Sequence, residues 1–365
     1  MVRIPIKTAS ANYEAVIKHG VLARAGDILH QLLGGNPPLF VITVPPVRRR
    51  WGNILLRSLS DARFPAKIIE MPNGERFKRL STVETLAESL IRAGADRKAV
   101  IIAFGGGVVG DVAGMLASVY MRGVKLVQIP TTVQAQLDAA IGGKTGVNLR
   151  AGKNLIGTFH QPELVLIDPA ILATLPEREF RAGMYEALKC GVIGNPELFA
   201  RLEKSSIANL HKDRSLLAWT ICESVRLKAK VVSADEKESD LRRVLNFGHT
   251  IGHALESATA YRRFLHGEAV AWGMVAATKI SADIGFCDHA LYQRIRHATL
   301  AWGPLPPVAV QAGTAMKLIQ SDKKTERGVT HFVLLKEIGK VEIATDVPQQ
   351  AITTALAEIR QASRD

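Results

Sequence analysis

The stretch AVIIAFGGGVVGDVAGMLASVY, residues 99–120, decides the fold of the first half of the chain. Its first six residues are all apolar, as in a parallel strand that helices cover on both faces. Gly105, Gly107 and Gly110 follow in GxGxxG spacing, before a predicted helix. This context suits a turn that binds the pyrophosphate of a dinucleotide, because glycines let the phosphates reach backbone N–H groups.

A tight strand-to-helix turn without a ligand is the alternative interpretation of this motif. The turn lies about a hundred residues into the chain, and no acidic residue follows about twenty positions later to hold a ribose. The glycine pattern alone therefore does not establish a nucleotide site.

Short apolar runs around this stretch extend an alternation of strands and helices. PPLFVITV (37–44), AKIIEMP (66–72) and VKLVQIPTT (124–132) are typical of strands, and STVETLAESLIRAGAD (81–96) is typical of an amphipathic helix. We therefore predict an α/β N-terminal nucleotide-binding domain with a doubly wound parallel sheet, spanning residues 1–175.

Helical periodicity dominates the chain from about Thr174 onward. The helical segments are 176–193, 215–238, 249–258 and 268–285. Close to the C-terminus, THFVLLKEIGKVEIATDV (330–347) indicates a small hairpin that turns at Gly339. Residues 176–365 are thus predicted to form a mainly α-helical C-terminal domain, which ends in this hairpin.

Composition narrows the range of partners. The formal net charge of +13 favours an anionic ligand. Aromatic residues make up only 5% of the chain and the basic residues are scattered, which argues against nucleic acid. No apolar run reaches the length of a membrane span, and the first twenty residues do not resemble a signal peptide. With three widely spaced cysteines, the chain is expected to be cytoplasmic and to bind neither nucleic acid nor a membrane.

Residues 127–162 concentrate small polar groups and lysines between glycines. They are Thr131, Thr132, Asp138, Lys144, Thr145, Asn148, Lys153 and Asn154. An ordinary polar loop is one interpretation, but loops at strand ends commonly hold ligands, so we favour anion binding here.

The helical half carries candidate metal ligands. His249 and His253 are four residues apart and project from one face of a predicted helix, while His266 stands just before another helix. Glu186, His249 and His266 could converge as one carboxylate and two imidazoles around a divalent ion, and such a set leaves room for substrate oxygens. Each histidine taken singly could equally be structural.

Several segments, in this order and spacing, resemble the 3-dehydroquinate synthase family. They are GGGVVGDVAG (105–114), RGVKLVQIPTT (122–132), LDAAIGGKTGVN (137–148), GKNLIGTFHQP (152–162), GMYEALKCGVI (183–193), LNFGHTIGHALE (245–256) and LHGEAVAWGM (265–274). The resemblance runs from about Pro72 to Asp322, with weaker similarity through the terminal hairpin. It implies an NAD-binding α/β domain followed by a helical metal domain.

The resemblance also implies roles for individual residues. Glu186, His249 and His266 match zinc ligands, and cobalt is the other candidate ion. The cofactor set is Gly106, Gly107, Val108, Asp111, Thr131, Thr132, Lys144 and Lys153, with Glu75 and Lys78 on the adenosine side. The substrate set is Asp138, Lys144, Asn154, Lys189, Lys228, Arg242, Asn246, His253 and one of Lys323 or Lys324. His253 and Lys189 are the candidates for proton handling. Arg122 resembles an arginine that reaches a neighbouring subunit, which implies a homodimer.

The family converts 3-deoxy-D-arabino-heptulosonate 7-phosphate into 3-dehydroquinate and phosphate, in the shikimate route to aromatic compounds. Transient oxidation by NAD, phosphate elimination, reduction, ring opening and aldol closure make up this reaction of a carbon–oxygen lyase. An anionic sugar phosphate as substrate would account for the basic composition.

Two features depart from the family pattern. VITVPPV (41–47) lacks the acidic or amide residue that usually meets the adenosine ribose, and Asp138-Ala139-Ala140 replaces a common Asp-Ser-Ser. Three alternatives are therefore kept. They are a sister cyclase acting on another sugar phosphate, a metal-dependent polyol dehydrogenase that releases reduced nicotinamide, and a binding protein without activity.

Overall fold

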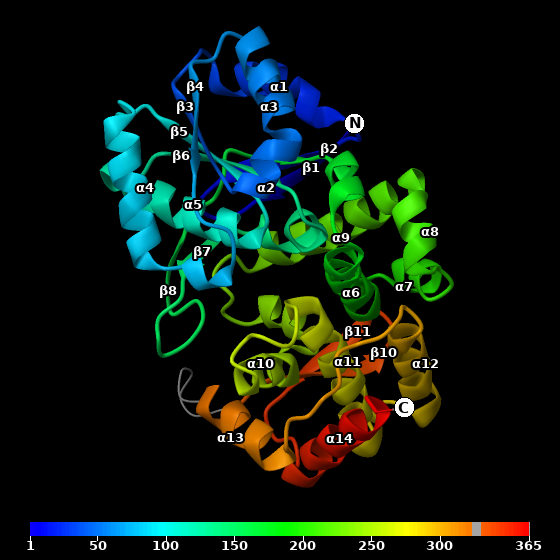
Figure 1. The fold of residues 1–365 in the computed structure, drawn as a ribbon. Helices are drawn as coiled ribbons and strands as arrows, with labels where there is room; N and C mark the ends of the chain where they lie inside the picture. The colour runs from blue at the N-terminus through cyan, green and yellow to red at the C-terminus, as the bar shows by residue number, and fades with distance from the viewer. Residues whose placement is uncertain (323–329, 365) are drawn as a thin grey trace. The chain divides into compact units, whose positions relative to one another are not determined.

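A computed structural model describes residues 1–322 and 330–364 and divides the chain into two compact units (Figure 1). Unit 1 comprises Met1–Leu175 and Leu217–Lys237, and unit 2 comprises Pro176–Leu216 and Glu238–Asp365. The units differ from the predicted domains in the segment 217–237, which belongs to unit 1. Helical periodicity correctly predicts that this segment is a helix, but it does not show to which domain the helix belongs. Contacts with residues far away in the sequence decide that.

Unit 1 contains a seven-stranded sheet in the order β1-β2-β9-β6-β5-β3-β4. Its strands are β1 (Val2–Lys7), β2 (Asn12–Ile17), β3 (Leu39–Thr43), β4 (Ala66–Glu70), β5 (Val100–Gly105), β6 (Lys125–Pro130) and β9 (Leu164–Ile167). Only β1 pairs antiparallel, with β2, and the other neighbours are parallel. The predicted parallel α/β architecture is confirmed, and β1, β2 and β9 add to the strands that the sequence predicted.

Helices cover both faces of this sheet. They are α1 (Ala25–Leu33), α2 (Pro45–Val47), α3 (Asn53–Asp61), α4 (Leu80–Arg92) and α5 (Gly107–Val119), and most of α9 (Arg214–Ala234) also belongs to unit 1. Alternate residues of β5 enter different cores, because successive side chains of a strand point to opposite faces. Ile101 shares a core with Leu86 of α4 and Leu116 of α5, whereas Ile102 shares the other core with Leu29 of α1. Burial on both faces explains why this strand is apolar throughout.

Strand order places the glycine turn at a switch point of the sheet. From β3 the chain runs to β4 on one side and to β5 on the other, which is the position where open α/β sheets bind ligands at their carboxyl ends. The hydroxyl of Thr43 at the end of β3 donates to the Phe104 carbonyl oxygen at 2.7 Å. The strand that borders the glycine turn at the switch point is β3, which comes before the turn in the sequence. An acidic residue for the ribose would therefore be expected at the end of β3 and not twenty residues after the turn.

Unit 2 is mainly helical. Its elements are α6 (Glu177–Gly194), α7 (Pro196–Leu202), α8 (Ile207–Lys212), α10 (His249–Ala258), α11 (His266–Asp283), α12 (His289–Leu300), α13 (Ala312–Asp322), α14 (Gln349–Ala362), β10 (Phe332–Glu337) and β11 (Lys340–Ala344). The two strands pair antiparallel, and Gly339 between them has a φ of 94°. The predicted helices and terminal hairpin are present. Within residues 1–322 and 330–364, no helix is long and apolar enough to cross a membrane.

Glycines bring the helices of unit 2 close together. A Cβ atom on Gly267 would lie 1.7 Å from the Ala182 carbonyl oxygen of α6, and one on Gly273 would lie 1.8 Å from the Gly248 carbonyl oxygen. Such distances leave no room for a side chain, so α11 packs through its backbone against α6 and the start of α10. Glu186, His249 and His266 lie on these helices.

Candidate functional site

In the glycine turn of unit 1, the backbone lies close to neighbouring side chains, and the first N–H groups of the following helix are free to bind a ligand. A Cβ atom on Gly105 would lie 2.5 Å from Val109 Cγ2, and one on Gly106 would lie 3.0 Å from Thr132 Cγ2. Gly110 N donates to the Gly106 carbonyl oxygen at 3.0 Å. The N–H groups that precede it at the start of α5 have no partner in the helix, which is the arrangement that binds phosphate at helix N-termini.

Threonines of the next strand end lie beside this turn. Thr131 N donates to the Gly105 carbonyl oxygen at 2.9 Å, and Thr132 contacts Gly106 through its methyl side. The parallel pairing of β5 with β6 thus brings together Gly106, Thr131 and Thr132, three members of the predicted cofactor set. Val44 and Pro45 follow β3 at the same edge of the sheet, so this strand end offers no carboxylate to a ribose.

A polar cluster forms around the buried Lys78, which is 4% exposed. Its ammonium group donates to the side chains of Asp111 in α5 and Asn154 in the loop before β8 (Ile156–Phe159). Burial raises the pKa of Asp111 above its ordinary value, against the opposing effect of the Lys78 charge. Glu75 joins the cluster, since its Oε1 accepts from Asn148 Nδ2 at 2.8 Å and lies 3.9 Å from Lys153 Nζ.

A second pair in unit 1 joins residues ninety positions apart. Lys228 Nζ of α9 donates to the backbone oxygen and to Oδ1 of Asp138, both at 2.6 Å. Asp138 lies in the π-helical turn Ala135–Ala139, which precedes Gly142, Gly143 and Lys144 at the start of β7 (Lys144–Val147). The structure therefore brings together two members of the predicted substrate set.

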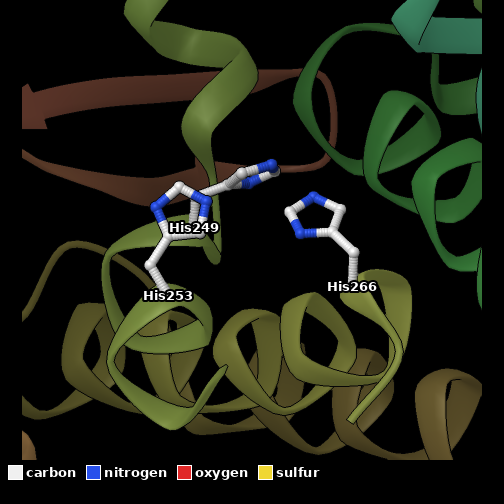
Figure 2. Close-up of side chains that lie close together, drawn as sticks. All are labelled: His249, His253 and His266. Carbon is white, nitrogen blue, oxygen red and sulfur yellow. The ribbon is translucent and has the colours of Figure 1, made fainter. Parts of the chain in front are cut away.

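In unit 2, a carboxylate and three imidazoles converge from three helices. Figure 2 shows His249 and His253 on α10 facing His266 in the first turn of α11. Their ligand nitrogens lie within 4.8 Å of one another. Glu186 Oε1 of α6 lies 3.3 Å from His266 Nε2 and 3.8 Å from His249 Nε2. Both candidate ligand sets, with Glu186 or with His253, share His249 and His266.

Hydrogen bonds to the far ring nitrogens orient two of these imidazoles. His249 Nδ1 lies 3.1 Å from the Phe247 carbonyl oxygen, and His266 Nδ1 lies 3.1 Å from Glu256 Oε2. A donated Nδ1–H fixes the tautomer and leaves the Nε2 lone pair free for an ion, and such carbonyl and carboxylate partners are typical of metal-binding histidines. Both Nε2 atoms face Glu186, which favours Glu186 over the exposed His253 as the third ligand.

The charges around Glu186 suit a bound cation. Burial opposes ionisation, but the Lys189 ammonium and the two imidazoles outweigh it and hold the pKa of Glu186 well below its ordinary value. Burial and the Lys189 charge lower the pKa of His249. Burial also disfavours the charged form of His266, yet its hydrogen bonds to Glu186 and Glu256 raise the pKa of this histidine to about 10. His266 therefore sits where carboxylates attract positive charge.

The geometry passes a simple test for zinc. Ligand atoms about 2.1 Å from a tetrahedral zinc ion lie roughly 3.4 Å apart, close to the separations between Glu186 and the two imidazoles. Glu186 Oε2 lies 2.6 Å from Lys189 Nζ, and Glu186 Oε1 faces Nε2 of His249 and His266. The Oε1 atom and the two Nε2 atoms are ligand types that zinc accepts.

Replacing Glu256 with glutamine tests the orientation of His266. We expect zinc affinity to fall about 10- to 100-fold, because a neutral amide supports the His266 ring less well than a carboxylate does. Competition with a fluorescent zinc chelator measures this affinity. Glu358→Gln, a change in the same unit on α14, is the control and should leave zinc affinity unchanged. Equal zinc affinity in Glu256→Gln and the unaltered chain would remove Glu256 from the site.

The remaining predicted site residues that the structure describes lie on elements outside the clusters described above. Arg242 is 2% exposed in the 3₁₀ turn Leu241–Asn246, and Asn246 Nδ2 donates to Glu238 Oε1 at 2.9 Å. Arg122 is exposed in the turn after α5, with a φ of 71°. Lys323 and Lys324 lie outside the described residues. The sequence analysis missed Glu256 and Glu238. Glu256 could have been found within LNFGHTIGHALE, because it lies three residues after His253 on the same helix.

Comparison with known proteins places this geometry in a family context. Residues 68–182 match the family model described as 3-dehydroquinate synthase N-terminal, and residues 183–325 match the model described as 3-dehydroquinate synthase C-terminal. A curated relative from Koribacter versatilis (strain Ellin345), named 3-dehydroquinate synthase, is 53% identical over 363 residues, covering 100% of this chain and 99% of the relative.

Two solved structures are similar over nearly the whole chain. One is 2-epi-5-epi-valiolone synthase from Streptomyces hygroscopicus subsp. jinggangensis 5008 with NAD+ and Zn2+ bound. It has 32% identity and a TM-score of 0.88, covering 97% of this chain and 98% of the other. The second is 2-deoxy-scyllo-inosose synthase complexed with carbaglucose-6-phosphate, NAD+ and Co2+. It has 27% identity and a TM-score of 0.87, covering 98% of this chain and 99% of the other.

Proposed function

Since the chain belongs to the 3-dehydroquinate synthase family, we propose that it converts 3-deoxy-D-arabino-heptulosonate 7-phosphate into 3-dehydroquinate and phosphate. The observation that carries this proposal is the buried Glu186 carboxylate facing Nε2 of both His249 and His266. One carboxylate and two imidazoles are the ligand types of a catalytic zinc site, which leaves a position open for a substrate oxygen. The reaction makes the chain a carbon–oxygen lyase in the shikimate route.

Both cofactors are assigned to residues with suitable chemistry. Zinc, or cobalt in its place, is assigned to Glu186, His249 and His266. NAD is assigned to the glycine turn and the Lys78 cluster, which comprise Gly106, Gly107, Val108, Asp111, Thr131, Thr132, Glu75, Lys78, Lys144 and Lys153. When bound, NAD would supply reversible hydride transfer, and the divalent ion would supply polarisation of substrate oxygens.

Charged side chains of the chain are assigned to the anionic substrate. Asp138 and Lys228 present an acceptor and a donor held at 2.6 Å from one another, which suits a sugar hydroxyl. Lys144, Asn154, Arg242 and Asn246 complete this set, and Arg242 can bind a carboxylate or phosphate through two parallel hydrogen bonds. Orientation by several such groups lowers the entropic cost of the later ring closure.

Lys189 and His253 are assigned to proton handling. Lys189 is buried and its Nζ lies 2.6 Å from Glu186 Oε2, so it can hold a hydroxyl or its proton beside the bound ion. His253 is exposed and its ring centroid lies 5.3 Å from that of His249. The two ring nitrogens of an imidazole can serve as one proton donor and one proton acceptor.

A sister sugar-phosphate cyclase is the second candidate function. It is favoured by the two structural neighbours, which act as cyclases of other rings, and by Ala139 and Ala140 where two hydroxyls are common. The 53% identity to a 3-dehydroquinate synthase over the whole chain favours the first candidate. A polyol dehydrogenase would differ in releasing reduced nicotinamide.

Phosphate release from 3-deoxy-D-arabino-heptulosonate 7-phosphate tests the proposal. We expect release to require NAD+, to stop after chelation with EDTA, and to return when Zn2+ or Co2+ is added, because both groups take part in every turnover. Absorbance at the nicotinamide band should show no accumulation of NADH. Absence of release from folded, metal-loaded protein would favour a sister cyclase, and accumulation of NADH with a polyol would favour a dehydrogenase.

The homodimer and the cytoplasmic location stay predictions. Sedimentation velocity at micromolar concentration would test the dimer, and Arg122→Ala would test whether this arginine serves a neighbouring subunit. Mixed samples of Arg122→Ala and a Glu186→Ala chain should recover part of the activity if the arginine acts across subunits, and none if it does not.

A further inference from the structure

The turn that delivers Lys144 to β7 is held by residues far away in the sequence. Gly142 and Gly143 have φ values of 93° and 66°, a backbone conformation that favours glycine. Neither residue has a side chain that could hold the turn in place. Gly142 N donates to the Tyr13 hydroxyl of β2 at 3.0 Å, and His160 N donates to the Gly143 carbonyl oxygen at 2.8 Å. Contacts with neighbouring segments therefore fix the path of this turn.

Gln161 packs directly onto the same turn. A Cβ atom on Gly143 would lie 2.6 Å from Gln161 Cδ, so the amide group occupies the space beside the glycine. Gln161 Nε2 donates to Glu236 Oε1 at 2.8 Å, while its own Oε1 is buried without a hydrogen-bond partner among the described parts of the chain. The hydrogen bond to Glu236 therefore orients the Gln161 amide, since within the described residues the amide oxygen has no hydrogen bond that would do so.

Glu236 also holds the turn between β1 and β2. Its Oε2 accepts from Ser10 N at 3.1 Å, and its Oε1 accepts from the Ser10 hydroxyl. Burial raises the pKa of Glu236, but the hydrogen bonds from Ser10 and Gln161 outweigh it and lower the pKa below its ordinary value. One ionised carboxylate thereby ties the end of α9 to both the β1–β2 turn and the Gln161 loop.

Through these contacts, the β1–β2 hairpin, the Gln161 loop and the end of α9 surround the turn before β7. Tyr13 follows Ser10 in the β1–β2 hairpin, and Lys228 lies on the helix that leads to Glu236 and donates to Asp138 before the turn. All of these residues belong to unit 1. Glu236 is the group that the hairpin, the Gln161 loop and the α9 end have in common.

We propose that Glu236, acting through Gln161, is a positioning residue that fixes the Gly142–Lys144 turn and aligns Lys144 with the Asp138–Lys228 pair. The catalytic part of this inference rests on the proposed function, which assigns Lys144, Asp138 and Lys228 to the substrate. The structural part, that Glu236 and Gln161 hold the turn in place, does not depend on that function. Glu236 does not touch the reacting groups. Its effect on catalysis is through the position of the turn.

Kinetics of Glu236→Ala, Gln161→Ala and the double variant test the role of this pair. Each single change is expected to lower kcat/KM about 10- to 100-fold, since small displacements of positioning groups cost that much. The double variant should be no worse than the poorer single variant, because both changes release the same turn. Glu236→Gln keeps an acceptor oxygen for Gln161 and should recover activity to within about threefold.

Glu223→Gln serves as the matched control. Glu223 lies on α9, the helix that leads to Glu236, and pairs with Arg226 at 3.3 Å. It should retain full activity. All variants should bind zinc like the unaltered chain, since the proposed zinc ligands belong to unit 2. Multiplicative losses in the double variant, or a Glu236→Ala chain with unchanged kcat/KM, would overturn the proposal.

Hydrogen exchange separates this inference from the proposed function. In Glu236→Ala, amide exchange over residues 140–147 should accelerate at least about tenfold, while exchange in α5 stays unchanged. This result would support the positioning role even if the chain acted on a different sugar phosphate. Unchanged exchange over 140–147 would refute the positioning role, whatever substrate is turned over.

Discussion

Replacing Glu186 with alanine is expected to abolish stable zinc binding and to lower kcat/KM by roughly 10³-fold or more. An ion that polarises substrate oxygens contributes several kcal/mol to transition-state stabilisation, and each 1.4 kcal/mol changes the rate about tenfold. Glu186 Oε1 lies within 4 Å of Nε2 in both His249 and His266. Its loss removes the anionic ligand and leaves two neutral or mutually repelling imidazoles.

Elemental analysis and phosphate release measure this effect together. Because Lys189 is buried beside Glu186, Glu186→Ala leaves an ammonium group without its carboxylate, at a cost of about 3–5 kcal/mol in stability. Glu186→Gln, which keeps the volume, is therefore made in parallel, and circular dichroism checks the fold of both. Glu177→Gln on the same helix is the control, since its side chain is 79% exposed. Full turnover in a folded, zinc-free Glu186 variant would contradict the metal assignment.

Gly267→Ala is expected to disturb the metal site without altering any ligand. The added methyl group would lie 1.7 Å from the Ala182 carbonyl oxygen, so the start of α11 must move away from α6. Because His266 precedes Gly267 and Glu186 follows Ala182 by one helical turn, this movement separates the two ligands. Overpacking of this kind costs about 1–3 kcal/mol or more, which corresponds to a fall in Tm of several degrees.

Differential scanning fluorimetry and zinc competition check this prediction. Zinc affinity should fall about tenfold or more, as ligand geometry in zinc sites tolerates deviations of only about 0.2 Å. Gly313→Ala in α13 is the matched control, because a Cβ atom at Gly313 has no neighbour within 4 Å in the part of the chain that the structure describes. This control should keep its zinc affinity and hold or slightly raise Tm, since alanine favours a helix more than glycine does. Unchanged zinc affinity in Gly267→Ala would show that the helix contact does not position His266.

The sequence alone predicted the main features of the α/β half. The apolar run before Gly105 is determined by burial on both faces of the sheet, and the glycines after it are required by contacts with Val109 and Thr132. These constraints act between residues close in sequence or are set by strand periodicity, so they leave a local pattern. The same holds for the residue types of the metal site, since imidazoles and carboxylates are the ligands that zinc prefers.

Other features depend on contacts that no local pattern records. The segment 217–237 is helical by its periodicity, but Asp138 and Ser10 decide that it belongs with unit 1. Strand order decided that β3, with Val44 and Pro45 at its end, borders the glycine turn.

The partners of the site residues likewise come from tertiary structure. Glu256 is one acidic residue among many in the sequence, and only the packing of α10 against α11 brings it to His266 Nδ1. Glu236 acquires its role from three segments that meet in space. The sequence thus determined which chemical groups and which elements exist, because side-chain type and local periodicity are properties of short segments. The tertiary structure alone decided which of these groups meet, because hydrogen bonds and ion pairs between distant segments form only when the chain is folded.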